Sequence, residues 1–328
     1  MTDGFRVFRA FLTQQRSYDE IPFDHPDLGP DGIQGLMSAA VVDRVEAGGE
    51  VHESSSHFLR VDDARAGGWV IALTASGGGY GVERDVVDVV TGATKQPIGS
   101  GDAVLNRLMT LLVLPNFGCD GLLIAQTQGR SHLTSALLRD VNYALHERGF
   151  HLRLEANLTD EIAWNDYLNS DGVDVKEIQL VQHVPSPDRT SFGDGRVVRA
   201  TLSLVLSDAG DTKKSVLGRM REAFTENKRP ELTDLVGMTA AGDDDFDEQK
   251  IVYVKNKRER TIKVEQSWPA FIHEISSDKP LDLKTLLGEC RDDAQAVLAE
   301  LGVDRPSTWW PQAHKMKVLA VRDDEVSE

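Results

Sequence analysis

Apolar runs and turns alternate most regularly in the middle of the chain, between residues 111 and 181. Two short apolar runs flank a Gly-containing turn at residues 115–120, an order typical of a β-hairpin. Leucine or valine then recurs every four residues, which predicts a helix with one buried stripe, an N-cap at Ser131 and an end at Gly149. The stripe consists of Leu133, Leu137, Val141 and Leu145. The expected strands are Leu111–Leu114, Gly121–Ala125, Phe150–Glu155 and Val175–Val181, and the expected helices are Ser131–Arg148 and Thr159–Leu168.

The first hundred residues are mainly β-structure by their pattern, and the C-terminal half alternates strands and helices. Strands are expected at Phe5–Phe11, His57–Val61, Trp69–Leu73 and Val82–Val90, a helix at Ile33–Val45 and a helical turn at Asp102–Met109. Further along we expect a strand at Val197–Leu206, a helix at Lys213–Asn227, a hairpin at Ile251–Val264 and a helix at Leu281–Leu301 that Gly288 interrupts.

These elements predict an α+β protein, with mixed sheets and helices packed on one side. We expect two domains, at residues 1–184 and 196–321, divided by a polar loop and followed by a tail at 322–328.

The formal net charge of −17 opposes non-specific attraction to nucleic acid or an anionic membrane, so any such binding needs a local basic surface. The sequence contains no apolar run long enough for a transmembrane helix and no basic, apolar leader. It has only two cysteines, Cys119 and Cys290, which makes a disulfide framework unexpected. The expected location is therefore the cytoplasm.

Motifs for catalysis, cofactors and metals are missing or incomplete. The glycine run Gly77–Gly81 lacks the Gly-Lys-Ser/Thr that a phosphate loop requires, and Gly210–Ser215 lacks its wrapping glycine. No Gly-x-Ser-x-Gly elbow is found, and Cys119 has no base near it in sequence. Two histidine pairs lie five residues apart, which is not a metal spacing on a helix. We therefore expect no catalytic residues, no cofactor and no metal ligands.

One arrangement of acids keeps an enzymatic alternative open. Glu231 or Asp234, followed by the sequence Glu248-Gln249-Lys250, resembles the spaced acid and Glu-x-Lys of restriction-type nucleases. There the carboxylates would hold Mg²⁺ and the lysine would steady the attacking water or the phosphate. In that family the Glu-x-Lys usually ends a strand, whereas here the pattern places it before the strand 251–254.

Basic residues gather in two places and give the strongest functional signal. At the tip of the expected hairpin are Lys255, Lys257, Arg258 and Arg260, and on the helix before it are Lys213, Lys214 and Arg219. Exposed lysine and arginine on a hairpin can pair with phosphates, or can keep a strand edge from associating. We expect these residues to bind nucleic acid or an acidic protein partner.

The order of elements between Gly101 and Val264 resembles that of the RexA-type phage-exclusion proteins. The shared features are an apolar strand, a Gly-containing turn, the strand Gly-Leu-Leu-Ile-Ala-Gln-Thr at 121–127, and Gly129-Arg130-Ser131 before the helix. A strand-rich distal segment follows, with Arg and Lys near Val197–Leu206 and at Lys255–Arg260. The resemblance implies a cytoplasmic, non-enzymatic protein of antiviral defence, a homodimer that binds DNA and works with a second defence protein. The acidity and the extra length of this chain depart from that pattern.

Overall fold

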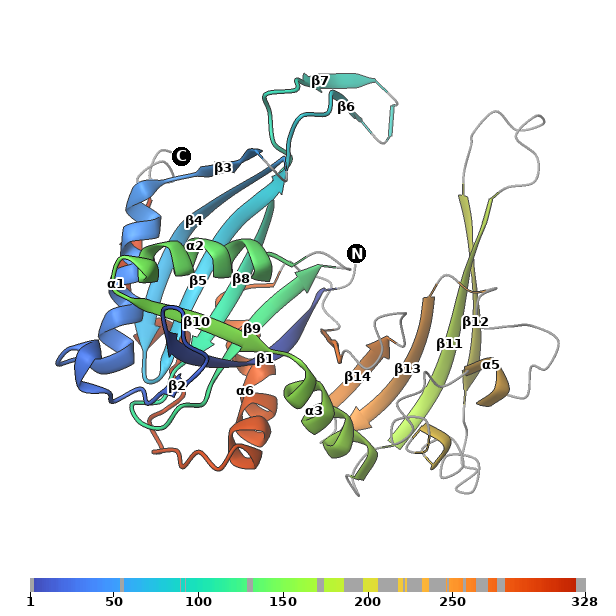
Figure 1. Cartoon of the computed structure of the whole chain (residues 1–328). Coiled ribbons are helices and arrows are strands. Elements are labelled where there is room, and N and C mark those ends of the chain that lie inside the picture. Colours follow the sequence, from blue (N-terminus) through green and yellow to red (C-terminus); the bar gives the residue numbers. More distant parts are fainter. Residues whose placement is uncertain are drawn as a thin grey trace. The chain divides into compact units, whose positions relative to one another are not determined.

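The computed structural model forms two compact units (Figure 1). Unit 1 consists of Val7–Glu155 and Pro280–Glu328, and unit 2 consists of Thr2–Arg6 and Ala156–Lys279. The predicted boundary near 184–196 therefore falls inside unit 2, and residues 280–321 belong with the first unit. The structure describes residues 3–53, 56–88, 90–91, 93–128, 132–169, 174–185, 197–205, 218–220, 222, 232–235, 246, 248–255, 258–263, 271–275 and 281–322.

A large sheet forms the centre of unit 1, with the strand order β10-β1-β9-β8-β5-β4-β16. Its strands are β1 (Asp3–Gln14), β4 (His57–Gly67), β5 (Val70–Gly79), β8 (Asn106–Val113), β9 (Gly121–Gln128), β10 (Phe150–Glu155) and β16 (Lys317–Val321). Short strands extend it, namely β2 (Glu20–Ile21) beside β1 and β3 (Glu50–His52) beside β4. The sheet and its helices confirm the α+β class, and each register defined in it is antiparallel.

The predicted central hairpin is β8 and β9, and it is buried on both faces. Leu111, Leu112 and Val113 lie opposite Ile124, Leu123 and Leu122, and none of the six is more than 2% exposed. Burial on both faces explains why the sequence has continuous apolar runs here instead of alternation. The helical turn predicted before it is wrong, because residues 106–109 pair with β5 and belong to β8.

Two helices, α1 (Gly32–Ala47) and α2 (Thr134–His146), pack on each other and contact β4 and β10 (Figure 1). The predicted stripe on α2 is confirmed, since Leu133, Leu137, Val141 and Leu145 are all buried. Gly149 has the expected left-handed φ of 82°, but α2 ends earlier, at His146, and Glu147 is its C-cap. The N-cap is Leu133 instead of Ser131, which lies outside the described residues.

The last helix, α6 (Leu283–Glu300), contacts β9 and continues through Gly288, so the predicted interruption is wrong. Asp282 caps it by accepting a hydrogen bond of 2.7 Å from the Thr285 backbone N–H. A buried face that includes Leu286, Cys290 and Leu298 outweighs the cost of one helical glycine, which is about 1 kcal/mol. α6 therefore presents a continuous outer face past Gly288.

Other predicted elements differ in their bounds. β4 and β5 include most of the connection expected at 62–68, which leaves a tight turn with Gly68 at a φ of 55°. The strand expected at 82–90 is the shorter β6 (Arg84–Val87), which pairs with β7 (Thr94–Ile98). Two 3-10 helices lie within the described residues, η1 (Pro26–Leu28) and η4 (Ala313–Lys315). None of the helices described here is long and apolar enough to cross a membrane.

Unit 2 contains a four-stranded sheet in the order β12-β11-β13-β14. Its elements are α3 (Asn157–Asn169), β11 (Asp174–Pro185), β12 (Val197–Val205), α5 (Leu232–Leu235), β13 (Glu248–Lys255), β14 (Arg258–Lys263) and β15 (His273–Ile275). Trp164 of α3 is fully buried and meets the Phe271 ring edge-on at 5.0 Å. Most of the helix predicted at 213–227 lies outside the described residues, with 218–220 and Glu222 helical.

Candidate functional site

The predicted basic hairpin is formed by β13 and β14 of unit 2. Lys255 lies opposite Arg258, and Tyr253 lies opposite Arg260. Residues opposite each other, and residues two apart on a strand, share a face of the sheet, so Lys255, Arg258 and Arg260 are on one face of the backbone. Lys257 lies outside the described residues.

Of the other predicted basic residues, one lies in the described part of the chain. Lys213 and Lys214 fall outside it. Arg219 is exposed in the helical turn at 218–220. The strand register of the described residues brings together the hairpin positions Lys255, Arg258 and Arg260.

The residues of the nuclease alternative are placed differently from expectation. Glu248 is the first residue of β13 and Lys250 follows two residues later on the same face, so the Glu-x-Lys is part of a strand and does not precede it. Pairing with β11, where Glu248 lies opposite Val181 and Lys250 opposite Gln179, explains strand formation by residues of low β-propensity. Lys250 is 7% exposed. Asp234 is in α5, and Glu231 lies outside the described residues.

A cluster that the sequence did not reveal lies in unit 1, where α1, β3 and α2 meet. The guanidinium of Arg44 is 2.5 Å from a Glu50 carboxylate oxygen and 3.4 Å from Asp140 Oδ2. The Nε2 atom of His52 is 3.3 Å from Asp140 Oδ1. Asp140 is almost fully buried, and burial raises the pKa of its carboxyl while Arg44 opposes that rise. We refer to these four residues as the Arg44 cluster.

The Arg44 cluster has the ligand types of a metal site but already contains a cation. Glu50, His52 and Asp140 can each offer one atom, and these atoms lie within 4.8 Å of one another. However, the Arg44 guanidinium contacts both carboxylates, so the positive charge that a metal ion would supply is present in the protein. The geometry is that of an internal ion-pair network joining two helices to a strand.

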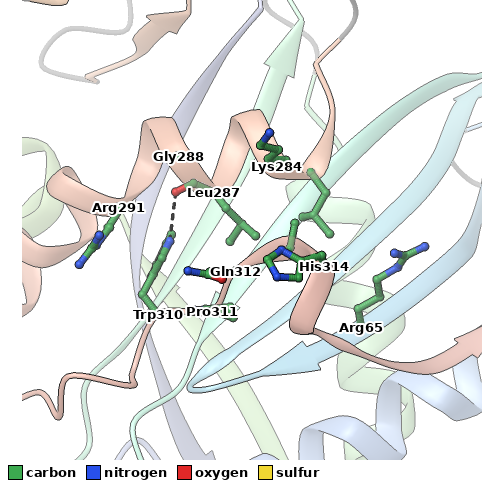
Figure 2. Close-up of a pocket in the computed structure, with 11 residues that line it drawn as sticks. Arg65, Lys284, Leu287, Gly288, Arg291, Trp310, Pro311, Gln312 and His314 are labelled. Atoms are coloured by element: carbon green, nitrogen blue, oxygen red, sulfur yellow. Dashed lines mark hydrogen bonds between the residues drawn. The ribbon is translucent and has the colours of Figure 1, made fainter.

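Unlike the buried Arg44 cluster, a second site on unit 1 is an open groove (Figure 2). One wall is a face of α6 on which Lys284, Leu287, Gly288 and Arg291 follow the helical i, i+3, i+4, i+7 spacing. Gly288 hollows this wall, because a Cβ atom there would have no neighbour within 4 Å. The cavity has a volume of about 790 Å³, within the range of ligand sites in proteins.

The second wall of the groove is the segment Trp310–His314, which is firmly held (Figure 2). Trp309, only 4% exposed, packs at 6.3 Å from the Trp69 ring, and its carbonyl oxygen accepts a hydrogen bond of 2.9 Å from the Trp69 N–H. The Trp310 indole N–H donates to the Leu287 carbonyl oxygen at 3.1 Å. This bond ties the segment to α6 and fixes the Trp310 ring in the groove.

The lining of the groove is basic and apolar. Among the described residues that line it, the basic ones are Arg65, Lys284, Arg291 and His314, and none is acidic. Arg65 forms an ion pair with Asp63 at 2.8 Å. The positive charge of Lys284 helps to lower the pKa of the neighbouring Asp282 carboxyl, after the hydrogen bonds that Thr285 gives it. Within the described residues, Arg291 and His314 form no ion pair. The groove is therefore a local reversal of the chain's negative charge.

The sequence alone did not reveal the Arg44 cluster or the groove, because the residues of each site are far apart along the chain. Arg65 is on β4, whereas the rest of the groove lies between residues 283 and 314. The one local signal was the spacing Lys284, Leu287, Gly288, Arg291, which the expected break at Gly288 obscured. No known protein family matches the sequence, and no curated protein or solved structure matches it either.

Proposed function

We propose that this chain is a binding protein without catalytic activity of its own, which contacts nucleic acid or an acidic protein partner through the β13–β14 hairpin. The observation that carries the proposal is the concentration of four cations, Lys255, Lys257, Arg258 and Arg260, within six residues of a chain with net charge −17. The backbone register supports it by placing three of the four on one face. Cations arranged in this way neutralise neighbouring phosphates or carboxylates.

Binding of nucleic acid through the hairpin has a characteristic salt dependence. Each phosphate that is neutralised releases counterions, so the slope of log affinity against log salt should flatten by about 0.9 for each duplex DNA phosphate that is no longer neutralised. The reagent is the variant with alanine at all four hairpin positions, checked for folding by circular dichroism. The control is the variant Lys315→Ala/Lys317→Ala, which removes two positive charges instead of four, at exposed positions of unit 1.

The hairpin experiment has two readouts. Retention of duplex or single-stranded nucleic acid by the wild type, lost in the hairpin variant and kept in the control, supports nucleic acid as the partner. If the wild type retains none at low salt, co-purified acidic proteins are compared between the two variants. A hairpin variant that keeps every co-purified partner and its oligomeric state would show that the hairpin is only a solvated tip.

The alternative of a Mg²⁺-dependent nuclease has one observation in its favour, namely the position of Glu248 and Lys250 on one face of β13. The carboxylates would bind the metal and the lysine would orient the water or the phosphate. The assay is incubation of the pure protein with single- and double-stranded DNA and RNA in Mg²⁺ or Mn²⁺. Cleavage that Glu248→Ala abolishes would establish the nuclease and overturn the binding-only proposal.

A role in antiviral defence, as a homodimer acting with a second defence protein, is a further part of the proposal and rests on the resemblance to RexA-type proteins. It predicts that expression of the chain with its genomic neighbours lowers phage plaque numbers, and that the hairpin variant restores them. Sedimentation of the pure protein tests the dimer. Unchanged plaque numbers and a monomeric protein would remove this part and leave the binding function to be judged separately.

A further inference from the structure

The cations of the groove are spaced for a ligand with more than one anionic group. Lys284 and Arg291 are seven residues apart, which is about 10 Å along a helix. Figure 2 shows their side chains at the two ends of the α6 wall, with Arg65 farther along the groove. A single compact anion such as phosphate cannot meet both ends. The groove therefore suits an elongated molecule that carries anionic groups at separate points.

Between these cations the groove offers a flat ring and groups that can hydrogen bond to a heterocycle. The indole N–H of Trp310 already donates a hydrogen bond to the Leu287 carbonyl oxygen, so a ligand can contact the ring only through its apolar surface. The Gln312 amide and the His314 imidazole lie on the same wall (Figure 2). An aromatic surface between cations is the combination with which proteins bind single-stranded nucleic acid, since every base can stack. An acidic peptide would need the cations but not the ring.

We infer that the groove between α6 and the segment Trp310–His314 binds single-stranded nucleic acid, with a base on Trp310 and phosphates at Lys284 and Arg291. The length of α6 between these two cations requires at least two nucleotides. The site belongs wholly to unit 1, so it does not depend on the hairpin of unit 2 or on the function proposed for it.

The test uses the full chain and fluorescein-labelled hexathymidylate, followed by anisotropy and by tryptophan fluorescence. Lys284→Gln/Arg291→Gln should weaken binding by about tenfold or more, because two phosphates no longer meet a cation. The control Lys315→Gln/Lys317→Gln, with the same change in net charge at exposed positions outside the groove, should change affinity by less than about twofold. Trp310→Leu should cost on the order of tenfold and remove most of the ligand-dependent change in fluorescence.

Substitutions of Gly288 test the shape of the groove without changing its charge, because a side chain at this position would enter the groove. Gly288→Leu should reduce binding to the level of the double variant, whereas Gly288→Ala should bind as the wild type does. Both substitutions favour the helix, because alanine and leucine have higher helix propensity than glycine, so loss of folding does not explain a loss of binding. Melting curves of the two variants provide the check.

Three outcomes with the wild-type protein would overturn the inference. They are no binding of hexathymidylate at low salt, equal affinity for thymidine monophosphate, and displacement of the oligonucleotide by pentaglutamate at the same charge concentration. The hairpin variant separates this site from the proposed function. If that variant loses all oligonucleotide binding while the groove variants keep it, the groove inference fails and the hairpin proposal stands. The reverse pattern supports the groove and removes nucleic acid as the ligand of the hairpin.

Discussion

The Arg44 cluster and the groove beside α6 both combine arginine with histidine in unit 1, but only the cluster surrounds them with carboxylates. In the cluster, Arg44 is 8% exposed and touches Glu50 and Asp140. In the groove, Arg291 and Lys284 are exposed, and no acidic side chain of the part of the chain that the structure describes lines the cavity. Matched and buried charges hold elements together, whereas accessible charges with little compensation are available to a ligand.

Among the charged residues, removal of Arg44 should have the largest effect on stability. Arg44→Met keeps much of the side-chain volume but leaves Asp140 buried without its cation, which should lower the free energy of unfolding by about 3 kcal/mol. Denaturant unfolding monitored by circular dichroism measures it. Because the pKa of Asp140 is already raised by burial, the loss should be smaller at acid pH, where the carboxyl takes up a proton.

An ion pair between α1 and the turn that follows α2 provides the matched control for Arg44. Arg148 and Asp43 are 2.8 Å apart, with side chains 32% and 51% exposed, so Arg148→Gln should cost less than about 1 kcal/mol. The double variant Arg44→Met/Asp140→Asn should lose less than the sum of the two single changes. Equal losses for Arg44→Met and Arg148→Gln would mean that the Arg44 cluster has no special structural role.

The packing beneath the Arg44 cluster can be tested through Leu137, which lies one helical turn before Asp140 on α2. Leu137 is 1% exposed, so Leu137→Ala should lower the free energy of unfolding by about 2–5 kcal/mol, and most strongly if the cavity cannot close. Ser135→Ala, at an exposed position of the same helix, should change stability by no more than about 0.5 kcal/mol. A melting temperature unaffected by Leu137→Ala would contradict the burial of the stripe.

A smaller effect should follow pH, because burial lowers the pKa of His57 and of His151 from 6.5. Between each lowered pKa and 6.5 the unfolded state binds more protons than the folded state, so the free energy of unfolding rises with pH there. This stability is complete above 6.5 and is lost as the pH falls. The variant His57→Gln/His151→Gln should flatten that slope in denaturant titrations between pH 5 and pH 7. A steeper slope would mean that protonation stabilises the fold.

The smallest effect on stability is expected in the groove. Lys284→Gln/Arg291→Gln removes two exposed cations, and neither is paired with a carboxylate among the described residues, so the free energy of unfolding should change by less than about 0.5 kcal/mol. Thermal melts with and without hexathymidylate measure the change. If the free energy of unfolding without ligand fell by several kcal/mol, Lys284 and Arg291 would be structural residues, as Arg44 is.

The sequence was most informative where burial itself determines the pattern. The run at 111–114 and the repeat at Leu137 and Val141 report positions that must be apolar, and both are buried. It was less informative where pairing partners decide the conformation. Residues 106–109 and Glu248-Gln249-Lys250 have weak strand preferences, yet neighbouring strands make them β-structure.

The candidate sites were even harder to predict from the sequence, because two of them depend on contacts between distant segments. The hairpin cations are close together in the sequence, so the hairpin could be predicted with its turn. The groove and the Arg44 cluster require knowing that β4 meets the 310–314 segment and that β3 meets α2, which no local pattern contains. The sequence spacing around His52 indicates no metal site, because its partner Asp140 lies on helix α2, far away along the chain.

The discontinuity of unit 1 has a consequence for how the protein folds. Residues 7–155 and 280–328 belong to one compact unit, and the whole of residues 156–279 is made between them. β16 pairs with β4, so the edge of the sheet is covered only after residue 317 has been synthesised. Until then the edge of β4 is open to other chains, and pairings so distant in sequence form slowly. Ribosome-bound chains that stop before α6 should therefore be prone to aggregation and should depend on chaperones.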